Sequence, residues 1–172
     1  MIKLIGGIVF ICLVSASIFI FNYFSVGKPI VEVLDSDPRN TGIKIDTHYK
    51  NYIQTSILAI NVKRVSGEKS AADIFRVLLQ YASKLKEKSF KLVLLQSKGK
   101  TKFKLEGEFF RKLGREFGEQ NPVYTMRTFT QNLYTPDGDN AFGTWTGGIL
   151  GVVKEQMEDF GEFHNKWYVE DM

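Results

Sequence analysis

The chain has 172 residues, of which 44% are hydrophobic and 13% aromatic, and its formal net charge at pH 7 is +4. This composition excludes an intrinsically disordered chain and predicts one globular domain with a hydrophobic core. The only cysteine, Cys12, lies in an apolar N-terminal segment, so the domain that follows has neither an internal disulfide nor thiol chemistry.

That N-terminal segment, residues 4–24 from Leu4 to Phe24, contains no charged residue. As a helix it would be about 31 Å long, which is enough to cross the hydrocarbon core of a bilayer. We therefore expect an uncleaved signal anchor that crosses the membrane once. Two alternatives remain open, a signal peptide cleaved after Val14-Ser15-Ala16 and a helix buried in the core of the domain.

The orientation of the anchor is weakly specified by charge. Lys3 precedes the apolar segment, whereas Lys28, Arg39 and Lys44 follow it, so the positive-inside rule favours neither orientation. A very short N-terminal tail followed by a long domain is the usual arrangement of a signal anchor whose N-terminus stays in the cytoplasm. We therefore expect a single-pass membrane protein whose soluble domain lies outside the cytoplasm.

Residues 25–42 contain a mixture of glycine, proline, aspartate and asparagine, which is typical of turns. We interpret them as a juxtamembrane linker with a turn and, at most, one short strand. Residues 43–172 then form the globular domain, which we expect to fold without the anchor.

Within residues 43–172, alternation of apolar and polar residues or continuous apolar runs predict five strands. The predicted strands are residues 43–49, 52–63, 90–96, 100–105 and 123–131. Apolar residues at spacings of three and four predict three helices. The predicted helices are residues 70–85, which begin at a capping-box pattern formed by Ser70 and Asp73, residues 108–117 and residues 149–167.

From residue 52 to residue 131 the predicted order is strand, helix, strand, strand, helix, strand. This order indicates an α+β fold with an antiparallel sheet and two or three packed helices, in the split βαβ arrangement of ferredoxin-like domains. The alternative is a meandering antiparallel sheet on which the helices pack in another order.

No catalytic, cofactor-binding or metal-binding residues are predicted. His48 and His164 are far apart in the sequence, and neither belongs to a pattern with the spacing of metal ligands. Phosphate-binding loops of the GxxxxGK[ST] type and the GxSxG motif of serine hydrolases are absent from the sequence. Lys102-Phe103-Lys104 lacks the fuller aromatic signature of RNA-binding domains, so we expect no nucleic-acid partner.

Charge is distributed unevenly along the chain. Residues 84–115 carry a net charge of +8, whereas residues 154–171 carry −4. The basic segment predicts a candidate surface for an anionic partner, either lipid headgroups or an acidic protein face, including the acidic C-terminal helix of a second copy. The alternative is a solvated face whose lysines protect an edge strand from aggregation. The residues of this candidate surface are Lys98, Lys100, Lys102, Lys104, Arg111, Lys112 and Arg115.

These observations favour a non-catalytic binding or accessory module, anchored by one span and associated with a protein partner in a membrane or envelope assembly. Two other functions remain as alternatives. One is an enzyme whose site is assembled from His48 and scattered carboxylates that form no sequence motif. The other is a domain that contacts anionic lipids.

Overall fold

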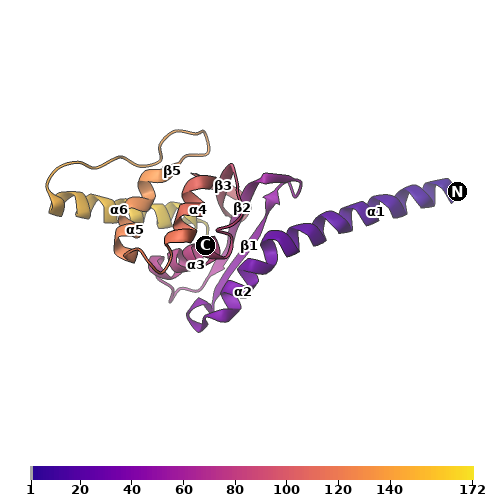
Figure 1. The fold of residues 1–172 in the computed structure, drawn as a ribbon, viewed down its shortest axis with the longest axis horizontal. Coiled ribbons are helices and arrows are strands. Elements are labelled where there is room, and N and C mark those ends of the chain that lie inside the picture. Colours follow the sequence, from indigo (N-terminus) through magenta and orange to yellow (C-terminus); the bar gives the residue numbers. More distant parts are fainter. Residues whose placement is uncertain (1) are drawn as a thin grey trace.

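The computed structural model describes residues 2–172, with side chains described throughout except at residues 2–5, 8 and 149. Helix α1 (Ile2–Asn22) projects from one end of the folded domain, as Figure 1 shows. Within the described residues, the helical stretch Val9–Ser36 is the one that is long and apolar enough to cross a membrane. Its most apolar window has a mean hydropathy of 2.1, and only 11% of that window is buried. This low burial disfavours the core-helix alternative.

The chain stays helical beyond α1, and the expectation of a linker with a turn or a short strand over residues 25–42 is wrong. A π-helical turn (Tyr23–Gly27) leads into α2 (Lys28–Ser36), which is followed by a 3-10 turn (Pro38–Asn40). Pro29 near the start of α2 has no N–H to donate, and it follows the π-helical turn, where the N–H of Lys28 bonds to the carbonyl of Tyr23 and the hydrogen-bond register of the helix changes. Three apolar residues at spacings of four and three belong to the domain core: Val26, Ile30 and Val33.

The sheet has five strands in the order β1-β2-β3-β4-β5. The strands are β1 (Ile43–Lys50), β2 (Gln54–Val65), β3 (Leu92–Ser97), β4 (Lys100–Glu106) and β5 (Leu133–Tyr134). β2 and β3 are parallel, and the other neighbouring pairs are antiparallel. The α+β class is therefore confirmed, but the sheet is mixed rather than antiparallel.

The ferredoxin-like order is wrong for two reasons. In a split βαβ unit another strand separates the two parallel strands, whereas here β2 and β3 are direct neighbours connected through α3 (Ala71–Lys84). In addition, the segment expected as a strand over residues 123–131 forms helix α5 (Pro122–Phe129). Asn121 caps this helix by accepting a hydrogen bond from the backbone N–H of Val123 at 2.9 Å.

The remaining helices occur where their periodicity predicts them. The capping box of α3 is present, because Ser70 and Asp73 each accept a hydrogen bond from the other's backbone N–H. α4 (Gly107–Glu116) and α6 (Ile149–Trp167) cover the same segments as the predicted helices to within one residue at each end. α4 packs against α3, and Gly114 permits the close approach, since a Cβ there would lie 2.3 Å from the carbonyl oxygen of Ala82.

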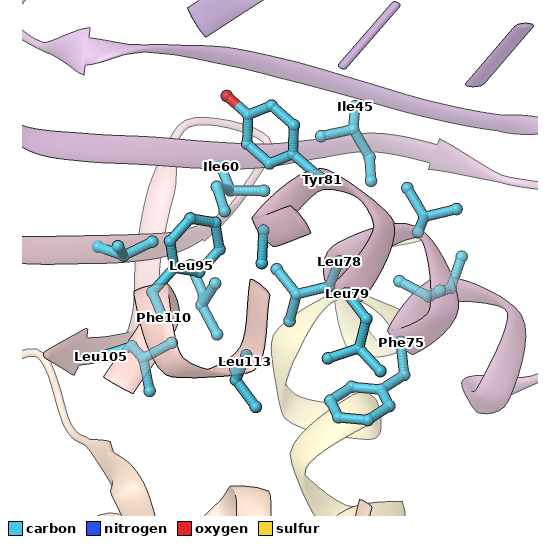
Figure 2. Close-up of a cluster of buried hydrophobic side chains, with 14 of the residues drawn as sticks. Ile45, Ile60, Phe75, Leu78, Leu79, Tyr81, Leu95, Leu105, Phe110 and Leu113 are labelled. Atoms are coloured by element: carbon cyan, nitrogen blue, oxygen red, sulfur yellow. The ribbon is translucent and has the colours of Figure 1, made fainter. Parts of the chain in front are cut away.

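The hydrophobic core lies between one face of the sheet and the helices. Figure 2 shows side chains from β1, β2, β3 and β4 meeting those of α3 and α4, with α3 at the centre. In β1 the alternation is clear, because Ile45, Thr47 and Tyr49 are buried while Asp46 and His48 are partly exposed. The first set faces the helices. The second set lies on the opposite face of the sheet, here named the outer face.

Candidate functional site

The junction between α1 and the domain is held by Asn22, the last residue of α1. Its Nδ2 donates hydrogen bonds to the carbonyl oxygens of Ile18 at 2.9 Å and Tyr52 at 2.6 Å. Its Oδ1 accepts a hydrogen bond from the backbone N–H of Tyr49 at 2.9 Å. Asn22 is 3% exposed, so these bonds replace water for a buried amide. The end of α1 is thereby attached to the β1–β2 hairpin.

A second set of contacts follows one turn later, at the carbonyl oxygen of Val26 in the π-helical turn. It accepts hydrogen bonds from Thr47 Oγ1 at 2.8 Å and from Tyr81 Oη at 2.9 Å. A carbonyl oxygen has two lone pairs, so it can accept from both hydroxyls. One backbone group of the π-helical turn is therefore bonded to both the sheet and α3. Burial raises the pKa of Tyr81 far above its usual value, so this hydroxyl keeps its proton and remains a donor.

Aromatic contacts extend the junction. The rings of Phe19 and Tyr52 lie 4.9 Å apart, and those of Phe21 and Tyr49 lie 5.8 Å apart, measured between centroids. Ser25 Oγ is 2.6 Å from the hydroxyl of Tyr49. Contacts at Phe19, Phe21, Asn22 and Ser25 make the junction a packed interface instead of a flexible tether.

The outer face of the sheet contains a hollow of about 530 Å³. The strand register places Asp46 opposite Asn61, and Asn61 opposite Gln96. A neighbouring row places Leu94 between Ala59 and Lys104. The hollow therefore combines carboxylate, amide, ammonium and apolar groups on a rigid sheet. Its lining includes Asp46, His48, Ala59, Asn61, Lys63, Leu94, Gln96, Thr101 and Lys104.

His48 is the one group of this hollow with a clear pKa shift. Partial burial lowers its pKa, the charge of Lys63 lowers it further, and Asp46 opposes both effects. The imidazole is therefore neutral at pH 7, and its ring lies edge-on to that of Tyr52 with centroids 4.6 Å apart. Asp46 is the carboxylate that shares the hollow with His48. Across the described residues, no group of three or more His, Cys, Asp or Glu side chains is arranged to hold a metal ion.

A second cavity, of about 390 Å³, lies between α3 and the α4–α5 connection. Its walls include Phe75, Leu79, Leu113 and Met126. The polar groups at its rim bond to one another: Asp37 accepts from Arg39 at 2.7 Å and from Gln80 at 3.1 Å, and Arg76 donates to Asn40 at 3.1 Å. The hydrogen bonds from Arg39 hold the pKa of Asp37 far below its usual value. This network fastens the Pro38–Asn40 turn to α3, so its charges have a structural role.

His164 is the most strongly perturbed histidine, and it lies in α6 among aromatic rings. It is 2% exposed, and neither ring nitrogen has a hydrogen-bond partner among the described residues. Burial lowers its pKa to about 3. Its ring lies 4.6 Å from that of Phe160 and 4.7 Å from that of Phe163. These surroundings make His164 a neutral member of the core.

The structure divides the four lysines that the sequence placed on one surface. A β-bulge in β4 pairs Thr101 with Gln96 and Phe103 with Leu95, and Lys102 is the extra residue between them. Lys104 stays on the outer face, opposite Leu94.

Two of the other lysines are paired with the C-terminal 3-10 turn (Val169–Asp171) of the same chain. Lys102 forms an ion pair with Asp171 at 3.0 Å, and Lys98 donates a hydrogen bond to the backbone carbonyl of Asp171. The pKa of Asp171 is lowered by its hydrogen bond with Lys102, and the nearby charge of Lys100 acts in the same direction. An acidic C-terminal segment therefore does meet the lysines, but within one chain.

The three basic residues of α4 belong to a different layer of the domain. Arg111 forms an ion pair with Glu108, and Lys112 forms one with Glu116 at 3.8 Å. Arg115 is exposed. Because α4 lies on the helical side of the sheet, these residues do not form one surface with Lys104.

Sequence reasoning missed the junction altogether. Asn22 was visible only as a polar residue near the end of an apolar segment, and its partners Tyr49 and Tyr52 are 27 and 30 residues away. The spacing of Val26, Ile30 and Val33 was the one available signal that the helix continues with an apolar side.

No protein-family model matches the chain, and neither a curated protein nor a solved structure matches it. The chemistry and placement of its residues are therefore the basis for any statement about its function.

Proposed function

We propose that the chain is a single-pass, membrane-anchored, non-catalytic module that presents the outer face of its sheet to a protein partner in a membrane or envelope assembly. In this proposal α1 crosses the bilayer and the domain lies outside the cytoplasm. The length and low burial of the apolar helix support the span.

The observation that carries the proposal is the packed junction. A flexible tether would be enough to keep an enzyme near a membrane. Here Asn22 bonds to the β1–β2 hairpin, and Val26 bonds to β1 and α3. These contacts fix the direction of the sheet relative to α1. A fixed direction matters for a domain that must meet a partner at a defined angle and height above the bilayer.

The outer face has the chemistry of a protein-binding surface. Its hollow is lined by the hydrogen-bonding groups of Asp46, Gln96 and Lys104 and by Leu94, which is itself only 5% exposed. Such a mixture of polar and apolar groups is typical of non-obligate protein interfaces. The helices pack on the other side of the sheet, and among the described residues Pro136, from the segment after β5, is the one lining residue that lies outside β1–β4 and their turns.

The lipid alternative is less well supported by the geometry. The β3–β4 turn with Lys98 and Lys100 lies at the Ser97 end of β3, and Ser97 is paired with Val62 of β2. The other end of β2, at Gln54, adjoins the hairpin that contacts α1. At about 3.3 Å per residue the lysine turn is roughly 26 Å farther along the strand, away from the membrane that α1 would cross.

The enzyme alternative requires several carboxylates near His48. Within the part of the chain that the structure describes, the outer-face hollow contains one carboxylate, that of Asp46, together with His48.

Site-specific photo-cross-linking of the full chain in its native membrane tests this proposal. A photoreactive amino acid at Lys63 or Lys104 should give one discrete cross-linked protein. The matched control positions are Lys112 and Lys154, which are exposed residues of α4 and α6. Cross-links of equal yield from all four positions, or from none of them, would contradict a partner on the outer face.

A labelling experiment tests the orientation. Glu68 is exposed and lies in the loop between β2 and α3. In a Cys12→Ser background, a Glu68→Cys variant should react in intact cells with a maleimide that cannot cross the membrane. Labelling only after the cells are broken would place the domain in the cytoplasm.

A further inference from the structure

The tip of the β1–β2 hairpin lies alongside the apolar part of α1. A groove of about 500 Å³ is lined by α1 side chains between Phe10 and Phe21 and, on its other side, by Tyr52, Ile53 and Thr55 of the hairpin. Figure 1 shows this hairpin reaching from the domain toward α1. The helix segment that contacts the groove begins about 18 Å before Asn22, at 1.5 Å per residue. The tip is therefore level with residues that the membrane would surround.

The composition of the tip suits this position. No charged residue occurs between Lys50 and Lys63, and Ile53 is 68% exposed in the structure. In the order Lys50, Asn51, Tyr52, Ile53, a cation and a polar amide come before an amphipathic aromatic ring and an exposed aliphatic side chain. This is the order expected for a loop that enters a bilayer from the headgroup side, because tyrosine concentrates at the interface and lysine extends toward water.

Several backbone polar groups of the tip form hydrogen bonds within the protein, which suits a position with little water. The carbonyl oxygen of Tyr52 accepts a hydrogen bond from Asn22, and the N–H of Tyr52 donates to the carbonyl of Tyr49 at 2.7 Å. The N–H of Thr55 donates to the carbonyl of Ile53 at 3.1 Å. Unpaired backbone groups are costly in lipid, so these internal bonds remove an obstacle to insertion.

We infer that the tip of the β1–β2 hairpin, centred on Ile53, is a second membrane-contacting element that inserts into the interfacial region of the bilayer beside α1. This inference rests on the proposed membrane span of α1 and adds a lipid-binding surface to it. Lipid from the region where headgroups meet acyl chains fills the groove between the tip and α1. Two points of contact, one at the helix and one at the hairpin, fix the tilt of the domain as well as its distance from the membrane.

Spin labelling of the full chain in phospholipid vesicles tests this inference. In a Cys12→Ser background, single cysteines carry a nitroxide at Ile53, at Val14 in α1 and at Glu68 in the β2–α3 loop. Ile53 and Glu68 are both exposed, so labels there should leave the fold intact. Accessibility to oxygen reports lipid, and accessibility to a water-soluble nickel chelate reports water. We expect the Ile53 label to be several-fold less accessible to nickel than the Glu68 label, and more accessible to oxygen.

The three labels separate the inference from the proposal on which it rests. If Val14 is protected from nickel but Ile53 is as accessible as Glu68, the hairpin stays in water and the inference is wrong while the span stands. If Val14 is also accessible to nickel, the membrane span itself is wrong. If Ile53 is shielded from both reagents, a protein segment covers the groove in place of lipid, which also overturns the inference.

Discussion

The side-chain amide nitrogen of Asn22 lies 2.6 Å from the carbonyl oxygen of Tyr52, so the last residue of α1 is attached to the turn between β1 and β2. Asn51 and Tyr52 in that turn have positive φ angles of 53° and 64°, which residues with side chains adopt rarely. The bond from Asn22 supports this uncommon turn. The end of the apolar helix and the shape of the hairpin therefore depend on each other.

We predict that Asn22→Ala lowers the free energy of unfolding by about 1–3 kcal/mol, because it leaves the Tyr49 N–H and the Tyr52 carbonyl without their partner in a buried place. Denaturant unfolding of the full chain in detergent micelles measures this change. Ser17→Ala is the matched control, since Ser17 is exposed on the same helix and bonds only to the carbonyl of Leu13. Equal stability of the two variants would show that the Asn22 contacts do not hold the junction.

The elements that the sequence predicted well are those whose determinants are local. α3 has a capping box and one apolar stripe, and both signals lie within its own residues. The turn between β3 and β4 likewise contains its own determinant, since Gly99 has a φ of 84° that favours glycine. In such cases the residues that determine the structure are the residues that adopt it.

The elements that were predicted wrongly depend on distant contacts. Residues 123–131 alternate in polarity like a strand, yet Thr125 and Phe129 also lie four residues apart, and both are buried on one side of α5. Residues 123–131 therefore fit both the spacing of a strand and the spacing of a helix. The rings of Phe75 and Phe163 pack on Phe129 and favour the helix. The β4 bulge could not be predicted from the sequence either, because strict alternation of lysines implies a regular strand.

The candidate site was the least predictable part. The outer-face hollow combines residues from four strands, and its composition depends on a register that only the folded sheet defines. The sequence names no particular partner for His48, because Asn61, Leu94 and Lys104, which line the same hollow, are remote from it in the sequence.

Our second prediction concerns the part of the chain that the domain requires. The sequence predicts that residues 43–172 fold without the rest, but Val26, Ile30 and Val33 are at most 2% exposed and belong to the core. Burial of each such side chain contributes about 1.5–3 kcal/mol, which together is comparable to the roughly 5–15 kcal/mol that stabilises a domain. We therefore predict that residues 21–172 unfold cooperatively, whereas residues 43–172 give a broad transition.

Calorimetry or circular dichroism on the two fragments at equal concentration measures this difference. A sharp transition of residues 43–172 at the same temperature as residues 21–172 would show that α2 does not contribute to the stability of the core.

The third prediction is a pH dependence that arises from His164. Its pKa is about 3 in the folded chain and about 6.5 when unfolded. Between these values the unfolded chain binds a proton that the folded chain does not, so stability rises with pH and is lost as the pH falls below 6.5. One proton corresponds to a slope of about 1.4 kcal/mol per pH unit.

His164→Leu should remove this slope between pH 4 and 6.5 and raise stability at pH 7, since two unpaired ring nitrogens leave the core. Urea unfolding at several pH values measures both effects. The control is His48→Gln, which should alter the slope less because His48 is only partly buried. An unchanged slope in His164→Leu would mean that His164 is protonated, or accessible to water, in the folded chain.

The last prediction tests how the β4 bulge divides the lysines. Lys102 is paired with Asp171, whereas Lys104 lies on the outer face opposite Leu94. Lys102→Gln should therefore loosen the C-terminal turn, and hydrogen–deuterium exchange of the peptide covering residues 168–172 should become faster. Lys104→Gln removes the same charge two residues away and should leave that exchange unchanged. If the strand were regular, both lysines would lie on one face, and the two variants would affect the C-terminal turn alike. Exchange that becomes equally faster in the two variants would thus contradict the bulge and restore the single lysine surface that the alternation suggests.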